Sequence, residues 1–129
     1  MSAQTPSKDR QQNTITVVFL DDNKTCPIKL DDSKQARAFL KLLPLELSLS
    51  DFNGTEKIAT LPKKLSLDEE PEGFEPKRGD VTYYIPWGNL AIFYKDFRYS
   101  EHLVHLGKLG DCMDNFPTGN TIPIRIETD

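Results

Sequence analysis

The fold is decided by residues 79–94, GDVTYYIPWGNLAIFY. Two runs rich in β-branched and aromatic residues, which favour strands, flank the short segment 86–89. Within that segment Pro86 presets the φ angle of a turn, and Gly88 adopts a positive φ at no steric cost. The stretch therefore predicts a β-hairpin. Both faces of the hairpin carry apolar side chains, which predicts a central position in a sheet rather than an edge.

Shorter strand patterns lie on both sides of this hairpin. Residues 14–20 and 26–30, separated by a turn cluster, predict a second hairpin. Because Pro27 has no amide proton to donate, we expect its strand to be an edge or to be bulged there. The remaining expected elements are a turn region over residues 51–60 around Asn53-Gly54, one helical turn over residues 111–116, and strands at residues 45–49, 102–109 and 122–126.

One amphipathic helix is predicted from about Ser33 to Leu43. Its apolar stripe recurs at helical spacing, at Ala36, Phe39, Leu40 and Leu43. Asp32 is the expected N-cap, because its carboxylate can accept hydrogen bonds from the exposed amides of the first turn, and Gln35 completes a capping-box-like pattern. Pro44 ends the helix, since it lacks an amide proton and disfavours helical geometry in the residue before it.

The composition is that of one soluble globular domain. The chain has 129 residues, of which 37% are hydrophobic and 28% charged, and its formal net charge is -4. A chain of this size buries a core that is large enough to be stable without disulfides or bound metal ions. Basic residues do not cluster and no apolar run is long enough for a membrane helix, so we expect neither nucleic acid nor membrane as a partner. The polar residues 1–13 predict a flexible tail, followed by a domain over residues 14–129.

The two cysteines, Cys26 and Cys112, are too few for a disulfide framework. Neither lies in a Cys-x-x-Cys pair, and the polar N-terminus does not resemble a secretory signal. We therefore expect both to be reduced thiols in a cytoplasmic protein. No phosphate loop, Ser-His-Asp arrangement or Cys-His pair is readable, so no cofactor is expected.

Six or more short strands with one main helix predict an α+β, mainly β fold that closes into a barrel, because closure removes exposed strand edges. The stretch from Lys77 to Tyr94 resembles the signature of small prokaryotic cyclophilin-like proteins. Residues 42–45, residues 54–58 and the strand at residues 103–109 resemble further motifs of that family. The resemblance covers roughly residues 14–127 and implies a cyclophilin-type closed β-barrel of about eight strands.

Cyclophilins isomerise the peptide bond before proline. In these enzymes an arginine within a Phe-His-Arg stretch hydrogen-bonds the prolyl nitrogen, and an apolar pocket holds the proline ring. This sequence has neither that stretch nor a Phe-Met-x-Gln-Gly-Gly-Asp stretch. No catalytic residue is therefore carried over from the family, and the fold alone does not fix an activity.

Eight of the twelve aromatic residues lie between Phe74 and Tyr99. Aromatic side chains offer large apolar faces at a small loss of entropy, so this cluster predicts an aromatic cleft with Tyr84, Trp87 and Phe93 as ligand-binding residues. The alternative is that these rings pack the core and its rim. Trp87 has the strongest case for recognition, because an exposed tryptophan at a turn is unfavourable.

Polar candidates stand beside the aromatic cluster. Arg98 is the candidate to polarise a carbonyl or a prolyl nitrogen, with a surface ion pair as the alternative. Glu56, with Lys57 next to it, is placed among the ligand-binding residues, and an exposed ion pair is again the alternative. His102 and His105 are three residues apart, which points them to opposite faces of a strand, so no metal site is expected.

Three functions follow, in order of preference. The first is a binding module that takes a peptide or a small molecule in the aromatic cleft. The second is a peptidyl-prolyl isomerase with a non-standard active site around Arg98, since that reaction needs only a water-poor apolar pocket and one hydrogen-bond donor. The third is a homo-oligomer with exposed residues of the hairpin at its interface.

Overall fold

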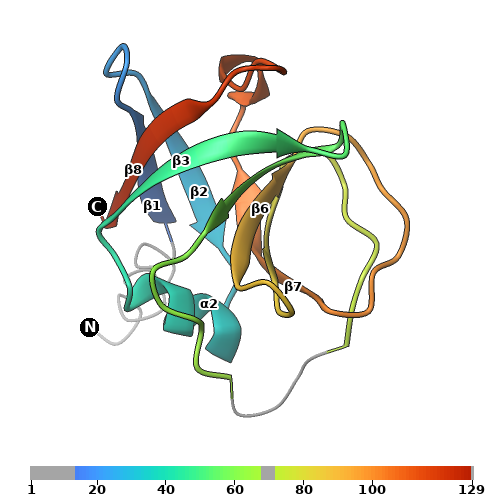
Figure 1. Cartoon of the computed structure of the whole chain (residues 1–129). Helices are drawn as coiled ribbons and strands as arrows, with labels where there is room; N and C mark the ends of the chain where they lie inside the picture. Colours follow the sequence, from blue (N-terminus) through green and yellow to red (C-terminus); the bar gives the residue numbers. More distant parts are fainter. Residues whose placement is uncertain (1–13, 68–71, 129) are drawn as a thin grey trace, which may run out of the picture.

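The computed structural model describes residues 14–67 and 72–128, which form a closed barrel of eight antiparallel strands (Figure 1). In chain order the strands are β1 (Thr14–Phe19), β2 (Thr25–Leu30), β3 (Leu45–Phe52), β4 (Glu56–Thr60), β5 (Asp80–Tyr84), β6 (Asn89–Phe93), β7 (Leu103–Leu109) and β8 (Ile122–Thr128). Around the barrel they pair in the order β1-β2-β7-β5-β6-β4-β3-β8, and β8 closes onto β1. The one α-helix of the described residues, α2 (Lys34–Leu40), lies across the lower end of the barrel in Figure 1. The predicted mainly β barrel with one main helix is confirmed.

The hairpin of residues 79–94 forms β5 and β6, which are both central strands. β6 lies between β5 and β4, and β5 lies between β6 and β7. Alternation along the two strands sends one face into the barrel core, namely Val81, Tyr83, Leu90 and Ile92. The opposite face, which includes Tyr84, Ala91 and Phe93, packs in a second and smaller apolar cluster outside the barrel. The two apolar faces of the sequence therefore correspond to two separate clusters.

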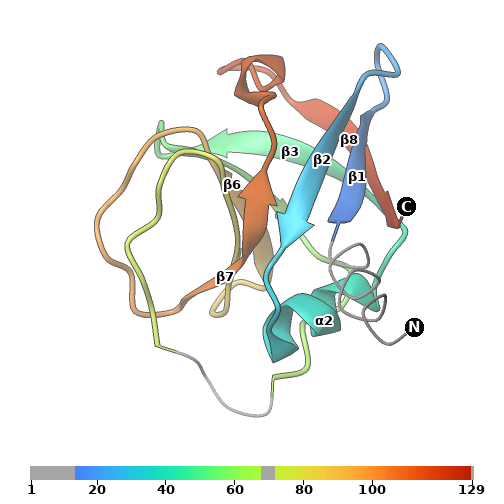
Figure 2. The same cartoon turned by 180° about the vertical axis from the view of Figure 1, so that it is seen from behind.

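β2 is not an edge strand, and the expectation drawn from Pro27 is wrong. The strand lies between β1 and β7 (Figure 2), and Pro27 pairs with Thr16 in a continuous β1–β2 register. The Pro27 carbonyl accepts a hydrogen bond from the Gly110 amide at 2.8 Å. Pro27 therefore faces Gly110, which lies one residue beyond the end of the β2–β7 ladder. A missing donor is tolerated there because no ladder carbonyl requires it.

Helix α2 is shorter than predicted and has a different N-cap. Ser33 occupies this position, and its hydroxyl accepts a hydrogen bond from the Ala36 amide at 3.1 Å. Asp32 instead forms an exposed ion pair with Arg37 at 2.8 Å. Serine and aspartate cap helices about equally well, so the sequence pattern does not separate two adjacent candidates. The helix ends at Leu40, before the predicted end.

The turn region expected over residues 51–60 is too broad. β3 continues to Phe52 and β4 begins at Glu56, so the turn itself is confined to the residues between them. Asn53 and Gly54 both have positive φ angles, 59° and 67°, as the turn signal predicts. The sequence pattern does not predict β4, because the first two residues of this strand are both charged, although they point to opposite faces.

The two cysteines are joined in a disulfide, so the expectation of two reduced thiols is wrong. Cys26 and Cys112 are 86 residues apart in the sequence, and their Cα atoms are 6.1 Å apart. Cys26 lies on β2, and Cys112 immediately precedes the short 3₁₀ helix η1 (Met113–Asn115). The cytoplasmic location expected from the polar N-terminus and the small number of cysteines stays a prediction.

Two expectations concern the N-terminus and the membrane. The predicted tail, residues 1–13, lies outside the described residues. Within residues 14–67 and 72–128, no helix is both long enough and apolar enough to cross a membrane.

The predicted helical turn over residues 111–116 is present as η1.

Candidate functional site

A second apolar cluster lies on the outer face of the barrel wall. Its buried members, from β6 and β7, are Ala91, Phe93 and Leu103, and Ile58, Phe74, Tyr84 and Phe97 pack against them. The segment after β6 runs outside β6 and β7, next to the segment before β5 (Figure 1). The antiparallel bridge between Phe74 and Ser100 joins these two segments. The hairpin is thus partly covered on its outer face by a loop layer.

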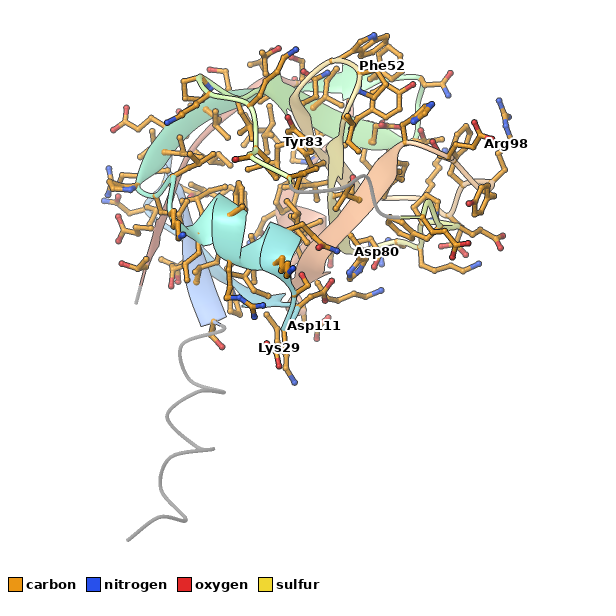
Figure 3. All side chains as sticks on the ribbon, turned by 90° about the horizontal axis from the view of Figure 1, so that it is seen from below. Lys29, Phe52, Asp80, Tyr83, Arg98 and Asp111 are labelled. Carbon is orange, nitrogen blue, oxygen red and sulfur yellow. A yellow bond between two sulfur atoms is a disulfide. The ribbon has the colours of Figure 1, made fainter. Side chains whose placement is uncertain are left out.

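A pocket of ≈ 470 Å³ opens on this outer cluster. Small-molecule sites fall in the same range of volumes. Strands β4 and β6 contribute outward-facing residues. The last residues of β3 and β5, the turns that follow these two strands, and residues 97–103 complete the lining. Phe52 and Arg98, which reach the pocket from two distant segments, lie on the same side of the molecule (Figure 3).

The structure brings together all five residues singled out from the sequence, since the pocket is lined by Glu56, Tyr84, Trp87, Phe93 and Arg98. The β4–β6 register sets Glu56 opposite Phe93. The β5–β6 register ends at the pair Tyr84 and Asn89, directly before and after the turn that holds Trp87. Strand alternation and barrel closure therefore assemble the group. That these residues bind a ligand stays a prediction.

The aromatic rings of the pocket are arranged around Trp87. The centroid of its ring lies 5.4 Å from those of Phe52 and Tyr84, and both pairs meet edge to face. Three large apolar side chains are exposed within the described residues, namely Phe52 (39%), Trp87 (52%) and Tyr99 (56%). All three line this pocket. The exposed apolar surface is therefore gathered at one concave site, which is typical of a recognition surface.

Glu56 and Lys57 do not form the exposed ion pair that the sequence left as an alternative. They point to opposite faces of β4, so that Glu56 lines the pocket and Lys57 is fully buried. The Lys57 ammonium lies 2.9 Å from the Asp51 carboxylate and donates to the carbonyl of Asn120 at 2.6 Å. The Tyr94 hydroxyl donates to the same carboxylate at 3.2 Å. Lys57 is thus part of a structural network that links β3, β4 and the loop before β8.

The Glu56 carboxyl is half-buried and accepts a hydrogen bond from the Thr55 hydroxyl at 2.8 Å. Burial raises the pKa of this carboxyl, and the hydrogen bond from Thr55 opposes that shift. No ion pair between Glu56 and a lysine, arginine or histidine is formed within the part of the chain that the structure describes. The pocket therefore contains an acidic group whose negative charge lacks a cationic partner there.

Arg98 lies at the exposed rim of the pocket. Its guanidinium carbon is 4.7 Å from the centroid of the Phe97 ring, a cation–π contact. Figure 3 shows its side chain extending away from the body of the molecule. Glu101 and His102 also belong to the rim, with Oε2 and Nε2 3.9 Å apart. The polar groups of this rim are exposed, whereas Glu56 is the half-buried one.

His105 belongs to a separate cluster at the start of β5. Its Nδ1 lies 2.5 Å from Asp31, and its Nε2 lies 3.1 Å from Asp80. The Lys108 ammonium is 3.2 Å from the same oxygen of Asp80. These contacts join the end of β2 to β5 and β7. His102 lies in the turn before β7 and not in the strand expected from residue 102 onward, whereas His105 lies on β7, so the two histidines have different surroundings.

Sequence reasoning did not select Phe52, Asn89 or Tyr99 as site residues, although all three line the pocket. Tyr99 lies at the end of the aromatic run, which was a usable signal. Phe52 gives no such signal, because it is far from that run in the sequence. It reaches the pocket since β4 pairs with both β3 and β6, and no local pattern encodes that strand order.

These features define a class of protein: an eight-stranded closed barrel with one helix and an external aromatic pocket. The chain belongs to the cyclophilin-like family, whose model matches residues 19–127. Among solved structures, that of a hypothetical protein from Archaeoglobus fulgidus is similar, with 15% identity, a TM-score of 0.67 and coverage of 92% of this chain and 95% of that chain. At this identity the likeness is one of fold. No curated protein matches the chain.

Proposed function

We propose that this protein is a binding module that takes a peptide segment or a small molecule in the pocket on the outer face of the barrel. One observation carries the proposal: Phe52, Trp87 and Tyr99, the exposed large apolar side chains of the described residues, all line one concavity. Rings left in water are unfavourable, and a ligand that covers them recovers this free energy. Glu56 and Asn89 add polar groups to mainly apolar walls, a combination typical of ligand sites.

Nuclear magnetic resonance tests this function directly. Short peptides and small aromatic molecules are titrated into the ¹⁵N-labelled protein, and shifts are expected at the indole N–H of Trp87 and the amides around it. Trp87→Ala is expected to weaken binding about tenfold, because the central ring is lost. Leu67→Ala, a half-buried apolar residue that does not line the pocket, is the matched control and should leave binding unchanged. Shifts confined to another surface would contradict the proposal.

A peptidyl-prolyl isomerase is the second candidate, because Arg98 lines the same pocket as Trp87 and Phe93. An apolar site with one donor near the prolyl nitrogen is sufficient for this reaction in principle. An isomerisation assay on an Ala-Pro peptide is expected to show a rate above background that falls in Arg98→Ala. Absence of any rate above background excludes the activity for that substrate.

Self-association through the exposed rings is the third candidate, with a second copy of the chain covering the pocket. Sedimentation over a range of concentrations tests it. A mass that rises with concentration, and no longer rises in Trp87→Ala, supports self-association. A monomer at high concentration rules it out.

A further inference from the structure

We propose that the pocket selects ligands that carry an organic ammonium group next to an apolar body, and that Glu56 is the residue that recognises the ammonium. This inference rests on the proposed binding function and specifies its ligand class. It joins two features of one site, a half-buried carboxylate and a wall of aromatic rings.

The first step concerns the charge on Glu56. Its carboxylate accepts a hydrogen bond only from the Thr55 hydroxyl, within the part of the chain that the structure describes. The neighbouring cations are engaged elsewhere: Lys57 points to the other face of β4, and Arg98 lies over the Phe97 ring. A carboxylate that has lost part of its hydration and has no cation beside it is unfavourable. A ligand cation would supply the missing partner.

The second step concerns the rings. Phe93 is the direct cross-strand partner of Glu56, and Tyr84 and Trp87 line the same pocket. The faces of aromatic rings carry partial negative charge and attract cations, most strongly where water is excluded. An ammonium held between the carboxylate and these rings is therefore stabilised by two interactions, an ion pair with Glu56 and a cation–π contact with the rings. A ligand anion would meet the half-buried carboxylate of Glu56 and would be disfavoured, because the opposing charge of Arg98 lies over the Phe97 ring at the exposed rim, where water screens it.

Three matched probes test the charge selectivity: 2-phenylethylamine, 2-phenylethanol and phenylacetate, which share an aromatic ring but are cationic, neutral and anionic. Trp87 is the single tryptophan of the chain, so its fluorescence reports binding at this pocket. At neutral pH the amine is expected to bind about tenfold more tightly than the alcohol, and phenylacetate is expected to bind most weakly. The blocked dipeptides acetyl-Phe-Lys-amide and acetyl-Phe-norleucine-amide compare a charged with an uncharged side chain on a peptide. Tighter binding of the lysine peptide would show that the pocket binds an ammonium group on a side chain.

Two variants assign the effect to one residue. Glu56→Gln is expected to abolish the preference for the amine while the affinity for 2-phenylethanol is kept. Glu101→Gln is the matched control, because this carboxylate also lines the pocket but its side chain is 80% exposed. Screening by water should limit its effect on amine binding to about twofold.

The outcomes separate the inference from the proposed function. Equal affinity of the unmodified protein for amine and alcohol overturns the ammonium inference and leaves the binding function intact, without reliance on any variant. A preference that persists in Glu56→Gln overturns the role of Glu56. Failure of all the probes to bind, up to their solubility limits, overturns the inference together with the proposed function.

Discussion

Glu56 and Lys57 are neighbours in the sequence but serve two different parts of the molecule. The first points out of the barrel into the pocket, and the second is fully buried on the other face of β4. A buried ammonium is tolerated only when its hydrogen-bonding capacity is used, and the Asp51 carboxylate and the Asn120 carbonyl provide the partners. At the scale of the residue, strand alternation separates a binding group from a structural one.

Lys57→Met tests the structural role. The substitution keeps most of the side-chain volume but removes the ammonium from Asp51 and Asn120, so we expect a loss of about 2 kcal/mol in the free energy of unfolding. Urea denaturation measures it. Lys95→Met, at an exposed position, is the control and should change stability by less than about 0.5 kcal/mol. Equal stability of the two variants would show that the buried network contributes nothing.

Asp51 gives a prediction for pH. Its carboxylate accepts hydrogen bonds from the Gly119 amide and the Lys57 ammonium, and these contacts lower its pKa below the ordinary value of 3.8. A lowered pKa in the folded state means that ionised Asp51 stabilises the fold above pH 3.8. This contribution is lost as the pH falls through the lower folded pKa. The stability difference between the unmodified protein and Asp51→Asn should therefore be constant near neutral pH and shrink in acid, which urea titrations at several pH values measure.

A constant stability difference down to the lowest pH would contradict this assignment. Asp96→Asn is a suitable control, because Asp96 is exposed and accepts a hydrogen bond from the Arg78 amide at 2.8 Å.

At the scale of the element, the outer wall of the site is made by the loop of residues 97–102 rather than by the barrel, and the segment around Phe74 supports this loop. The bridge between Phe74 and Ser100 holds these segments together, and its two backbone hydrogen bonds measure 3.2 and 3.0 Å. Gly73 makes the close approach possible. A Cβ atom at this position would overlap the carbonyl oxygen of Ser100 and lie 2.7 Å from the Cα of Glu101. Both of these residues line the pocket, so the shape of the site depends on a glycine outside it.

Gly73→Ala is expected to displace the loop that carries Ser100 while the barrel remains folded. Overpacking of this kind costs about 1–3 kcal/mol, and because the contact is confined to two loops we expect the change to appear chiefly as weaker ligand binding. Amide hydrogen exchange should rise in residues 97–102 and stay unchanged in β1 and β8. Gly119→Asn, where nothing lies within 4 Å of an added Cβ, is the control. Unaltered exchange in the loop would show that Gly73 is not required for the wall.

At the scale of the whole molecule, barrel closure and the disulfide both join segments that are distant in the sequence. β1 pairs with β8, which brings the first described strand against the last. Cys26 on β2 is joined to Cys112, which follows β7. A cross-link over so long a stretch of chain restricts the unfolded state strongly in the chain-entropy account.

The disulfide predicts a specific response to reduction. The oxidised protein should lose about 2–4 kcal/mol of unfolding free energy on treatment with dithiothreitol, and Cys112→Ser should lose a similar amount and no longer respond. Thermal unfolding with and without reductant measures this. Before reduction, the intact mass should be lower than that of the dithiol by two hydrogen atoms. Detection of two free thiols in the protein as isolated would contradict the pairing.

The sequence by itself determined the strand-rich class of the fold, the central hairpin and the family. These features depend on local patterns: the period-two alternation of residues 81–93, the turn signals at Asn53-Gly54 and Gly88, and ordered motifs along the chain. It also selected Tyr84, Trp87 and Phe93, because aromatic residues close together in a hairpin stay close together in space.

The tertiary structure alone decided which distant residues share a site or a bond. The pairing of β4 with β6 sets Glu56 beside the aromatic hairpin, and the same pairing turns Lys57 into the core. The contact between Cys26 and Cys112 and the choice of Ser33 over Asp32 as the helix cap also depend on the folded chain. Each of these results follows from strand order or from packing between distant segments. Local sequence patterns encode neither the strand order nor this packing.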